Sequence, residues 1–362
     1  MLVPRFAITT KIANALMRLE AAKQSIADLP MTPNVQARLR ETARLLSTHY
    51  STQIEGNRLA LDEATRVIKN REHIRGRKRD EQEVLGYYRA LDELEKLVEK
   101  KAKITEKTIQ TLHALVMGGR RGKVKPSPYR DGQNVIRDSK SGAIVYLPPE
   151  AKDTPMLMSD LVKWLETSQK DDLPCPLRAA VAHYQFVTIH PYYDGSGRTA
   201  RLLTTLVLHL GGYDLKGFYS LEEYYARDLT AYYAALTVGP SHNYYLGRHK
   251  ADITSWLEYF VVGMADAFER VQRRAKEEAH LGRIDRSHAL RQLDARQRKV
   301  LVLFRKYEWV TSAHVEKTLA LTGRTARYLC QRWVEEGFFV VTDPSRKTRK
   351  YGLAAGLMSL IS

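Results

Sequence analysis

Residues 189–201 gather the side chains and backbone that phosphate chemistry needs. They read Ile-His-Pro-Tyr-Tyr-Asp-Gly-Ser-Gly-Arg-Thr-Ala-Arg, so Gly195 and Gly197 flank Ser196. Glycines let backbone N–H groups turn toward a ligand. An apolar run follows and predicts a helix, whose first turn would carry unpaired N–H donors and the positive end of the helix dipole. The stretch therefore predicts an anion site.

Charged and titratable side chains stand beside this loop. His190 can act as a general base, and Asp194 can bind a hard divalent cation that keeps oxygen positions open for phosphate. Arg198 and Arg201, three residues apart on the following helix, would place two guanidinium groups next to the anion. Taken singly, each residue is more often part of an ordinary surface turn. Together, with the glycine spacing intact, they predict phosphoryl or nucleotidyl transfer.

The rest of the chain supplies mostly helices to position this loop. Apolar side chains recur at helical spacing, and most of the first 270 residues favour a helix. Helices are expected over residues 10–28, 35–50, 61–74, 80–100, 105–116, 154–168, 176–189, 202–210, 220–236, 253–267 and 270–279. The predicted fold class is mainly α.

The loop resembles the signature of the Fic (filamentation induced by cAMP) family, His-Pro-Phe-x-Asp/Glu-Gly-Asn-Gly-Arg-x-x-Arg. The chain matches it without a gap from His190 to Arg201, with Tyr192 in place of Phe and Ser196 in place of Asn. These two departures bear on packing and rate more than on the reaction. The resemblance implies a helical Fic core and a protein adenylyltransferase, which moves AMP from ATP to a Ser, Thr or Tyr hydroxyl of a target protein.

The resemblance also assigns roles within the signature. His190 would be the catalytic base and Asp194 would hold Mg²⁺. The remaining nucleotide-binding positions would be Gly195, Ser196, Gly197, Arg198 and Arg201.

A second motif lies upstream, in residues 47–57. Ser51 and Glu55 share one face of a helix, and Gly56-Asn57 is a common helix end, so the residues alone predict an ordinary helix terminus. The segment also resembles the inhibitory helix of Fic proteins, Ser/Thr-x-x-x-Glu-Gly/Asn. That resemblance implies a salt bridge from Glu55 to Arg201 in the space of the ATP γ-phosphate, and hence an autoinhibited ground state.

Two further segments acquire roles from the same resemblance. Residues 129–133, Tyr-Arg-Asp-Gly-Gln, are similar to a Fic segment, and the β-branched run Ile144-Val145-Tyr146 fits the short hairpin, or flap, that docks a target. Tyr232 is the candidate to stack on adenine. From the residues alone, an ordinary surface hairpin and a core tyrosine remain open.

The last part of the chain is basic and differs in pattern. Between Arg270 and Lys350 there are 20 Lys and Arg against 9 Asp and Glu, an excess of 11 positive charges. Three short helices and two strands over residues 290–362 resemble a winged helix-turn-helix. Candidate phosphate contacts are Arg324, Arg327, Arg346, Lys347 and Arg349. Dimerisation or docking of a protein remains an alternative role for such a unit.

The whole chain of 362 residues, with a formal net charge of +17, suggests more than one domain. We expect an N-terminal helical region over residues 1–100, a Fic core over 101–270, a charged connector helix over 271–289 and a winged helix over 290–362. No apolar run is long enough for a membrane span, the N-terminus lacks the pattern of a secretory signal, and only two cysteines occur. These features predict a cytoplasmic protein with no membrane partner.

Rival functions remain open at this point. The Fic core could sense a nucleotide in a DNA-binding regulator, or remove AMP from a protein with Glu55 orienting water, or transfer another phosphate-linked group. Self-modification and a homodimer are also open. A P-loop ATPase is disfavoured because the chain lacks Gly-x-x-x-x-Gly-Lys-Ser/Thr.

Overall fold

The computed structural model describes residues 2–29, 31–118, 124–137, 142–169, 172–239, 241–281, 290–345 and 349–361. Within these ranges the chain is mainly helical, and its strands form two antiparallel two-stranded hairpins. The predicted fold class is therefore confirmed. No helix in these ranges is both long and apolar enough to cross a membrane.

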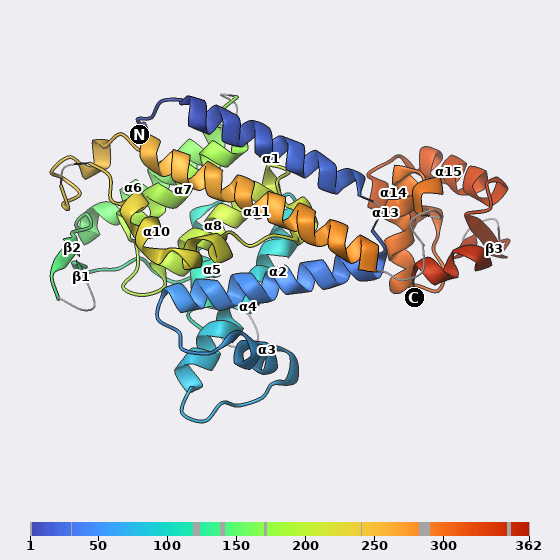
Figure 1. Cartoon of the computed structure of the whole chain (residues 1–362), viewed down its shortest axis with the longest axis horizontal. Coiled ribbons are helices and arrows are strands. Elements are labelled where there is room, and N and C mark those ends of the chain that lie inside the picture. The colour runs from blue at the N-terminus through green and yellow to red at the C-terminus, as the bar shows by residue number, and fades with distance from the viewer. Residues whose placement is uncertain are drawn as a thin grey trace. The chain divides into compact units, whose positions relative to one another are not determined.

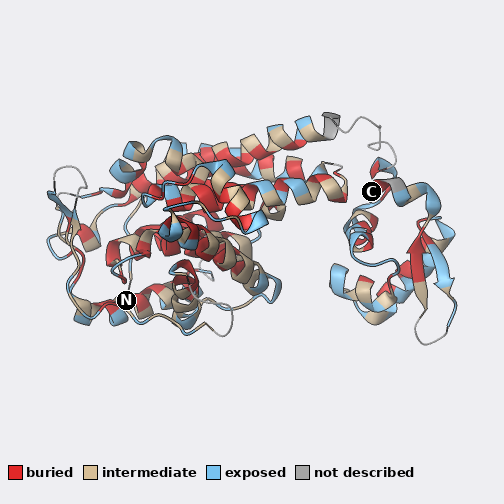
Figure 2. Cartoon of the chain, turned by 90° about the horizontal axis from the view of Figure 1, so that it is seen from below, coloured by how far each residue is buried: buried red, intermediate tan, exposed pale blue. Residues whose placement is uncertain are grey.

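The chain divides into two compact units. The larger comprises Met1–Ala27 and Glu41–Val271, and the smaller comprises Asp28–Arg40 and Gln272–Ser362. Each unit has its own buried apolar residues (Figure 2).

The helices up to α11, all but α9 labelled in Figure 1, have the following bounds: α1 Thr10–Asp28, α2 Pro33–Ile54, α3 Leu61–Asn70, α4 Lys78–Glu99, α5 Glu106–Val116, α6 Thr154–Thr167, α7 Cys175–Ile189, α8 Ser196–Leu210, α9 Leu221–Arg227, α10 Leu229–Leu236 and α11 Thr254–Leu281. Short 3₁₀ turns are η1 Ala151–Asp153, η2 Leu215–Gly217 and η3 Arg248–Lys250. The hairpin pairs β1 Ile136–Arg137 with β2 Ile144–Tyr146.

Helix α7 lies at the centre of the larger unit, where nearly every one of its side chains is buried. Pro174 and Pro176 start it, because a proline ring already has helical φ and the first N–H groups of a helix need no partner inside it. Its neighbour α8 is also mostly buried and carries the two signature arginines. The predicted loop is thus mounted on the two most deeply buried helices of the unit.

Helix α2 ends in the way that its sequence predicts. The N–H of Gly56 donates to the carbonyl of Gln53, and the N–H of Asn57 donates to the carbonyl of Thr52. Gly56 has a φ of 90°, so this is the left-handed glycine turn that commonly closes helices. The turn fixes the direction in which Glu55 leaves the helix.

One helical prediction needs correction. The segment 220–236, expected as one helix, is two, because Asp228 leaves the helical conformation and accepts a hydrogen bond from the N–H of Ala231, which caps α10. The segment 270–279 continues the helix of residues 253–267, as predicted, and the two form the single helix α11. Nothing in the sequence between them breaks a helix, since neither Pro nor Gly occurs there.

The smaller unit contains a helix-turn-helix arrangement followed by a hairpin. Its elements are α13 Ala295–Leu301, η4 Val302–Arg305, α14 Ser312–Leu319, α15 Gly323–Glu335, β3 Phe339–Asp343, β4 Lys350–Leu353 and η5 Ala355–Leu360. Val300, Val315, Cys330 and Trp333 are fully buried within it, and Phe339 pairs with Leu353 across the two strands. This unit therefore has a core of its own.

Candidate active site

The predicted anion loop turns sharply at both of its ends. Helix α7 stops at His190, whose φ is 50°, and α8 starts after Gly195, whose φ is 77°. A Cβ atom on Gly195 would lie only 2.9 Å from Sδ of Met117 and 3.2 Å from Nε2 of His113. Gly195 is therefore needed both for its backbone angle and for the close approach of α5.

His190 is held through its backbone. Its carbonyl accepts a 2.9 Å hydrogen bond from Nε of Arg130, a buried side chain that also donates to the carbonyls of Gly132 and Pro149. Burial lowers the pKa of the His190 imidazole to about 4, against the opposing charge of Glu55. At neutral pH the ring is uncharged, so it can accept a proton.

Arg198 is a buried cation, and two of its three side-chain nitrogens have no hydrogen-bond partner among the described residues. Its side chain is 1% exposed, and Nη2 donates to Oδ1 of Asp194 at 2.8 Å. Nε and Nη1 are buried and have no hydrogen-bond partner in the described part of the chain. Buried charged donors are costly unless an acceptor satisfies them, so this side chain fits an anionic ligand such as phosphate.

Arg201 is buried as well, but its donors are used within the protein. Nε donates to Oγ of Ser51, and Nη2 donates both to the carbonyl of Ser51 and to Oε1 of Glu55, each at 2.8 Å. Burial works against the charge of Arg201, but the Glu55 carboxylate outweighs it and raises the pKa of the guanidinium. The structure thus brings the two motifs into direct contact.

Glu55 also covers the glycine loop. A Cβ atom on Gly197 would lie 2.3 Å from Oε1 of Glu55. The carboxylate therefore rests against the backbone at the start of α8, where the sequence predicts phosphate. Gly197 permits this contact because it has no side chain.

Asp194, the predicted metal ligand, has a half-exposed carboxylate. Its Oδ1 accepts from the N–H of Gly195 at 2.6 Å as well as from Arg198. The described residues include no cluster of three or more His, Cys, Asp or Glu side chains that could hold a metal ion. An ion at Asp194 would take its other ligands from phosphate and water, which suits Mg²⁺.

The two departures from the signature have distinct consequences. Oγ of Ser196 donates to the carbonyl of Tyr192 and accepts from its N–H, so Ser196 braces the loop from within. The ring of Tyr192 is buried, and its hydroxyl has no hydrogen-bond partner in the described structure. A buried phenol normally forms a hydrogen bond, so the hydroxyl of Tyr192 is unsatisfied among the described residues.

Tyr232 is placed differently from its predicted role. Its side chain is 2% exposed, its hydroxyl lies 3.0 Å from Nε2 of His183, and its ring stacks on Tyr225. This is the core alternative that the sequence left open, and such a ring offers no face to a base. Tyr233 is 47% exposed, and its hydroxyl donates to the carbonyl of Ile54 at the end of α2.

The hairpin β1–β2 presents two of its three candidate residues. Ile144 and Val145 are exposed, whereas Tyr146 is buried and donates its hydroxyl to the carbonyl of Thr188 in the last turn of α7. Tyr146 therefore anchors the hairpin at the end of α7, whereas Ile144 and Val145 are exposed to solvent.

Residues 103–208 match the model of the Fic/DOC family. The matched segment runs from the residues before α5 into α8, so it includes the complete loop from His190 to Gly195. The chain contains a Fic domain.

Curated relatives of the Fic domain are named "Protein adenylyltransferase Fic". The one from Drosophila grimshawi is 30% identical over 199 residues, which cover 55% of this chain and 40% of the relative. The one from Drosophila persimilis is 29% identical over 199 residues and is covered to 38%. The chain thus spans about two fifths of the length of these relatives.

Solved structures share the fold. A Fic family protein from Desulfovibrio desulfuricans G20 is 25% identical with a TM-score of 0.61, and the match covers 98% of each chain. Fic-1 from C. elegans is 24% identical with a TM-score of 0.57, and the match covers 74% of this chain and 73% of that one. The first match includes the elements of the smaller unit.

Three residues that the sequence analysis did not single out contact the loop or its arginine. His113 of α5 donates from Nε2 to the carbonyl of Asp194, and Arg130 holds His190. Glu83 of α4 lies 3.8 Å from Arg198. All three are far from the loop in sequence, and no local spacing points to them. The similarity of residues 129–133 to a Fic segment was the only available signal, and it concerned Arg130 alone.

The nucleic-acid candidates outside the Fic domain are only partly described. Arg324 and Arg327 are exposed on α15, and Arg349 is half-buried before β4. Arg346 and Lys347 lie outside the described residues.

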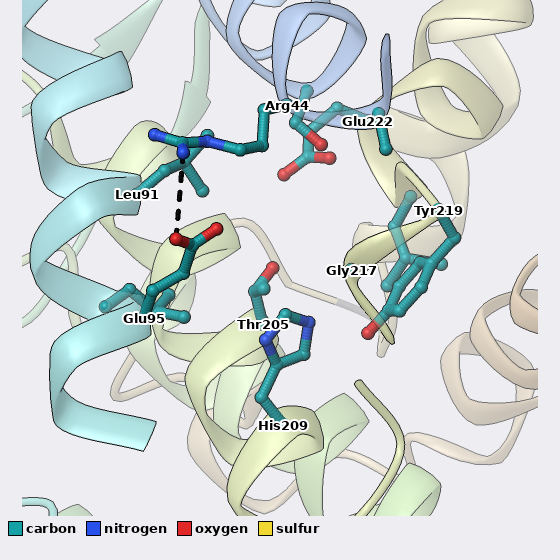
Figure 3. A pocket seen from close by; sticks show the side chains of 12 residues that line it. Arg44, Leu91, Glu95, Thr205, His209, Gly217, Tyr219 and Glu222 are labelled. Carbon is teal, nitrogen blue, oxygen red and sulfur yellow. Dashed lines mark ion pairs between the residues drawn. The ribbon is translucent and has the colours of Figure 1, made fainter. Parts of the chain in front are cut away.

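A small cavity adjoins α2 but does not suit a nucleotide. It lies between α2, α4, α8 and the segment before α9, has a volume of about 30 Å³, and is bordered by Arg44, Thr205, His209 and Glu222 (Figure 3). That volume is on the scale of a single water molecule. Burial lowers the pKa of His209 to about 4, so the imidazole beside the cavity is neutral.

Proposed function

We propose that the protein transfers AMP from ATP to the hydroxyl of a Ser, Thr or Tyr side chain in a target protein. The observation that carries this proposal is that an uncharged His190, at the end of α7, stands one short turn from Arg198 of α8, whose buried Nε and Nη1 have no acceptor among the described residues. The relatives named "Protein adenylyltransferase Fic" support the same activity.

In this proposal the α- and β-phosphates of ATP rest over Gly195–Gly197, where the helix N-terminus favours negative charge. His190 accepts the proton of the target hydroxyl while its oxygen bonds to the α-phosphorus. The bond from the α-phosphorus to the oxygen bridging the β-phosphate breaks, and pyrophosphate leaves with that electron pair. Arg198 and Arg201 neutralise the developing charge. Mg²⁺ held by Asp194 would polarise the phosphate oxygens.

We also propose that Glu55 holds the enzyme in an inhibited state. Its carboxylate is joined to Arg201 and lies against Gly197, on the surface where the phosphates would bind. A carboxylate tethered so close competes at a high effective concentration. It can therefore keep ATP in a nonproductive position without preventing its binding.

The test of inhibition is the Glu55→Gly variant, which should incorporate more labelled AMP from ATP into itself or a target than the unmodified protein. Gln53→Gly is the matched control, because Gln53 is exposed on the same helical turn and adds equal backbone freedom without touching Arg201. No rise for Glu55→Gly, or an equal rise for both variants, would remove the inhibitory role of Glu55.

Side chains that are exposed to solvent are the candidates to dock the target protein and to stack on the adenine ring. The exposed pair Ile144 and Val145 is suited to dock a target segment as an added strand. Tyr233 replaces Tyr232 as the candidate to stack on adenine, because its ring is exposed and Tyr232 is in the core. Self-modification and a homodimer stay predictions, to be checked by labelling of the isolated protein and by its mass in solution.

A second candidate function belongs to the smaller unit. We propose that it is a winged helix that binds DNA, because Arg324, Arg327 and Gln331 are exposed on α15, the second helix of the helix-turn-helix. Retention of the full chain on DNA without any AMP transfer, even in Glu55→Gly, would instead favour a nucleotide-sensing regulator. Removal of AMP from a modified protein, lost in Glu55→Gly, would favour the de-AMPylase alternative.

The proposed location is the cytoplasm. Cys175 and Cys330 are both buried free thiols, which suits a reducing compartment.

A further inference from the structure

Arg198 has two carboxylate neighbours that reach it from different places. Asp194 belongs to the loop and shares a 2.8 Å hydrogen bond with Nη2. Oε1 of Glu83, on α4, lies 3.8 Å from Nη1. That distance is too long for a hydrogen bond, and Nη1 has no other partner in the described structure. Glu83 therefore offsets part of the charge of Arg198 while leaving its donor unused.

Glu83 is held in this position by the end of the inhibitory helix. Its Oε2 accepts a 2.9 Å hydrogen bond from Nδ2 of Asn57, which also donates to the carbonyl of Asp80. Asn57 is itself buried and is the residue that closes α2. On the outer side, the exposed Arg79 donates from Nε to Oε1 of Glu83 at 3.1 Å.

Each of the two arginines, Arg198 and Arg201, thus faces a carboxylate that is positioned by the turn at the end of α2. Glu55 precedes Gly56-Asn57 and pairs with Arg201, while Glu83 is fastened to Asn57 and faces Arg198. Glu55 lies against the backbone of Gly197, whereas Glu83 approaches the side chain of Arg198 from α4. The first can obstruct a phosphate, and the second acts only through the electrostatic potential at the arginine.

We propose that Glu83 is a second inhibitory carboxylate, a positioning residue that weakens the binding of ATP by neutralising Arg198. This inference rests on the proposed adenylyl transfer, since it presumes that Arg198 binds phosphate. A carboxylate close to Nη1 lowers the positive potential that an incoming polyanion experiences. Its effect falls on the affinity for ATP, whereas the effect of Glu55 falls on the productive position of bound ATP.

The first test compares Glu83→Gln with Glu93→Gln. Glutamine at position 83 keeps an oxygen for Asn57 and removes only the charge. Glu93 is on the same helix and its only ion pair among the described residues is with Lys96, so it controls for loss of one negative charge. Titration with ATP and Mg²⁺ should show the dissociation constant falling by roughly three- to tenfold for Glu83→Gln and unchanged for Glu93→Gln.

The same pair placed in the Glu55→Gly background separates binding from turnover. Glu83→Gln should lower the KM for ATP by a similar factor and leave kcat for AMP transfer within about twofold. A merely structural role for Glu83 would instead lower kcat or the melting temperature. An unchanged or higher dissociation constant for ATP in Glu83→Gln overturns the inference.

A second variant, for which we expect weaker ATP binding, tests the inference if Glu83→Gln folds poorly. Arg79→Gln removes the exposed cation that shares Glu83, so the carboxylate is freer to neutralise Arg198 and ATP should bind more weakly. Lys78→Gln is the matched control, a neighbouring exposed cation. Equal effects of Arg79→Gln and Lys78→Gln contradict the inference, and weakening confined to Arg79→Gln supports it.

Failure of the inference can be told from failure of the proposed function. If Glu55→Gly transfers AMP but Glu83→Gln binds ATP as Glu93→Gln does, only the role of Glu83 is lost. If no variant binds ATP or transfers AMP, the proposed function falls and the role of Glu83 falls with it.

Discussion

The ring of His113 lies flat against the ring of Tyr192, with ring centroids 3.5 Å apart and an angle of 12° between their planes. The same imidazole donates from Nε2 to the carbonyl of Asp194 at 2.9 Å. Helix α5 thus braces the Fic loop at two points, and the tyrosine that departs from the family signature forms one of them.

Replacing Tyr192 with the phenylalanine of the signature should stabilise the protein. The Tyr192 hydroxyl is buried and has no partner among the described residues, and its removal keeps the ring that stacks on His113. We expect the free energy of unfolding to rise by about 1–3 kcal/mol. Urea titration of Tyr192→Phe against the unmodified protein measures this change.

Tyr129→Phe provides the control of opposite sign. Tyr129 also contacts the ring of Tyr192, but its hydroxyl donates to Oε2 of Glu106 at 2.8 Å. Losing that bond should destabilise the fold. Equal changes in both variants would mean that the hydroxyl of Tyr192 is satisfied in solution.

The bond from His113 to Asp194 should matter for catalysis. His113→Phe keeps the ring stack and loses the donor, whereas His113→Gln keeps a donor and loses the ring. The carbonyl of Asp194 belongs to the same loop as the N–H groups that would bind phosphate, so loss of this hydrogen bond should displace those groups. We expect His113→Phe to lower AMP transfer by roughly tenfold in the Glu55→Gly background. His113→Gln should recover part of that loss. Full activity of His113→Phe would show that the stack alone holds the loop.

Acid should destabilise the larger unit through His183. Burial lowers the pKa of this imidazole to about 3, from an ordinary value near 6.5, and both of its nitrogens face hydroxyl groups, those of Thr204 and Tyr232. Between about pH 6.5 and pH 3 the unfolded chain therefore binds a proton at His183 that the folded chain does not bind. Stability should be complete above about pH 6.5 and fall toward pH 3, by at most about 1.4 kcal/mol per pH unit from this group.

His183→Asn should make that dependence shallower. Melting temperatures between pH 7 and pH 4.5 test this, with His73→Asn as the control because the side chain of His73 is 91% exposed. Parallel curves for the unmodified protein and His183→Asn would rule out His183 as a source of the acid sensitivity.

Local signals in the sequence were sufficient for most elements and for the position of the loop between two helices. Apolar periodicity located the helices, and the glycine turn at Gly56 ended α2 as its residues predict. The Fic signature placed His190 and Arg198 correctly on either side of one turn, because a short loop keeps sequence neighbours together in space.

The missed features depend on contacts between distant segments. Whether Tyr232 or Tyr233 faces the core is set by the phase of α10, and that phase follows from the break at Asp228 and from packing against α7 and α11. Glu83 and His113 reach the loop only because α4 and α5 pack against α8. No spacing along the chain encodes those approaches, so a single sequence cannot reveal them.

Proton removal by His190 is the central step of the proposed AMP transfer. AMP incorporation from ATP labelled at the α-phosphorus should be compared between Glu55→Gly and the double variant Glu55→Gly/His190→Ala, with ATP binding measured alongside. We predict that the double variant binds ATP with the same affinity and loses transfer by roughly 10²–10⁴-fold. Equal incorporation by the two variants would contradict the account.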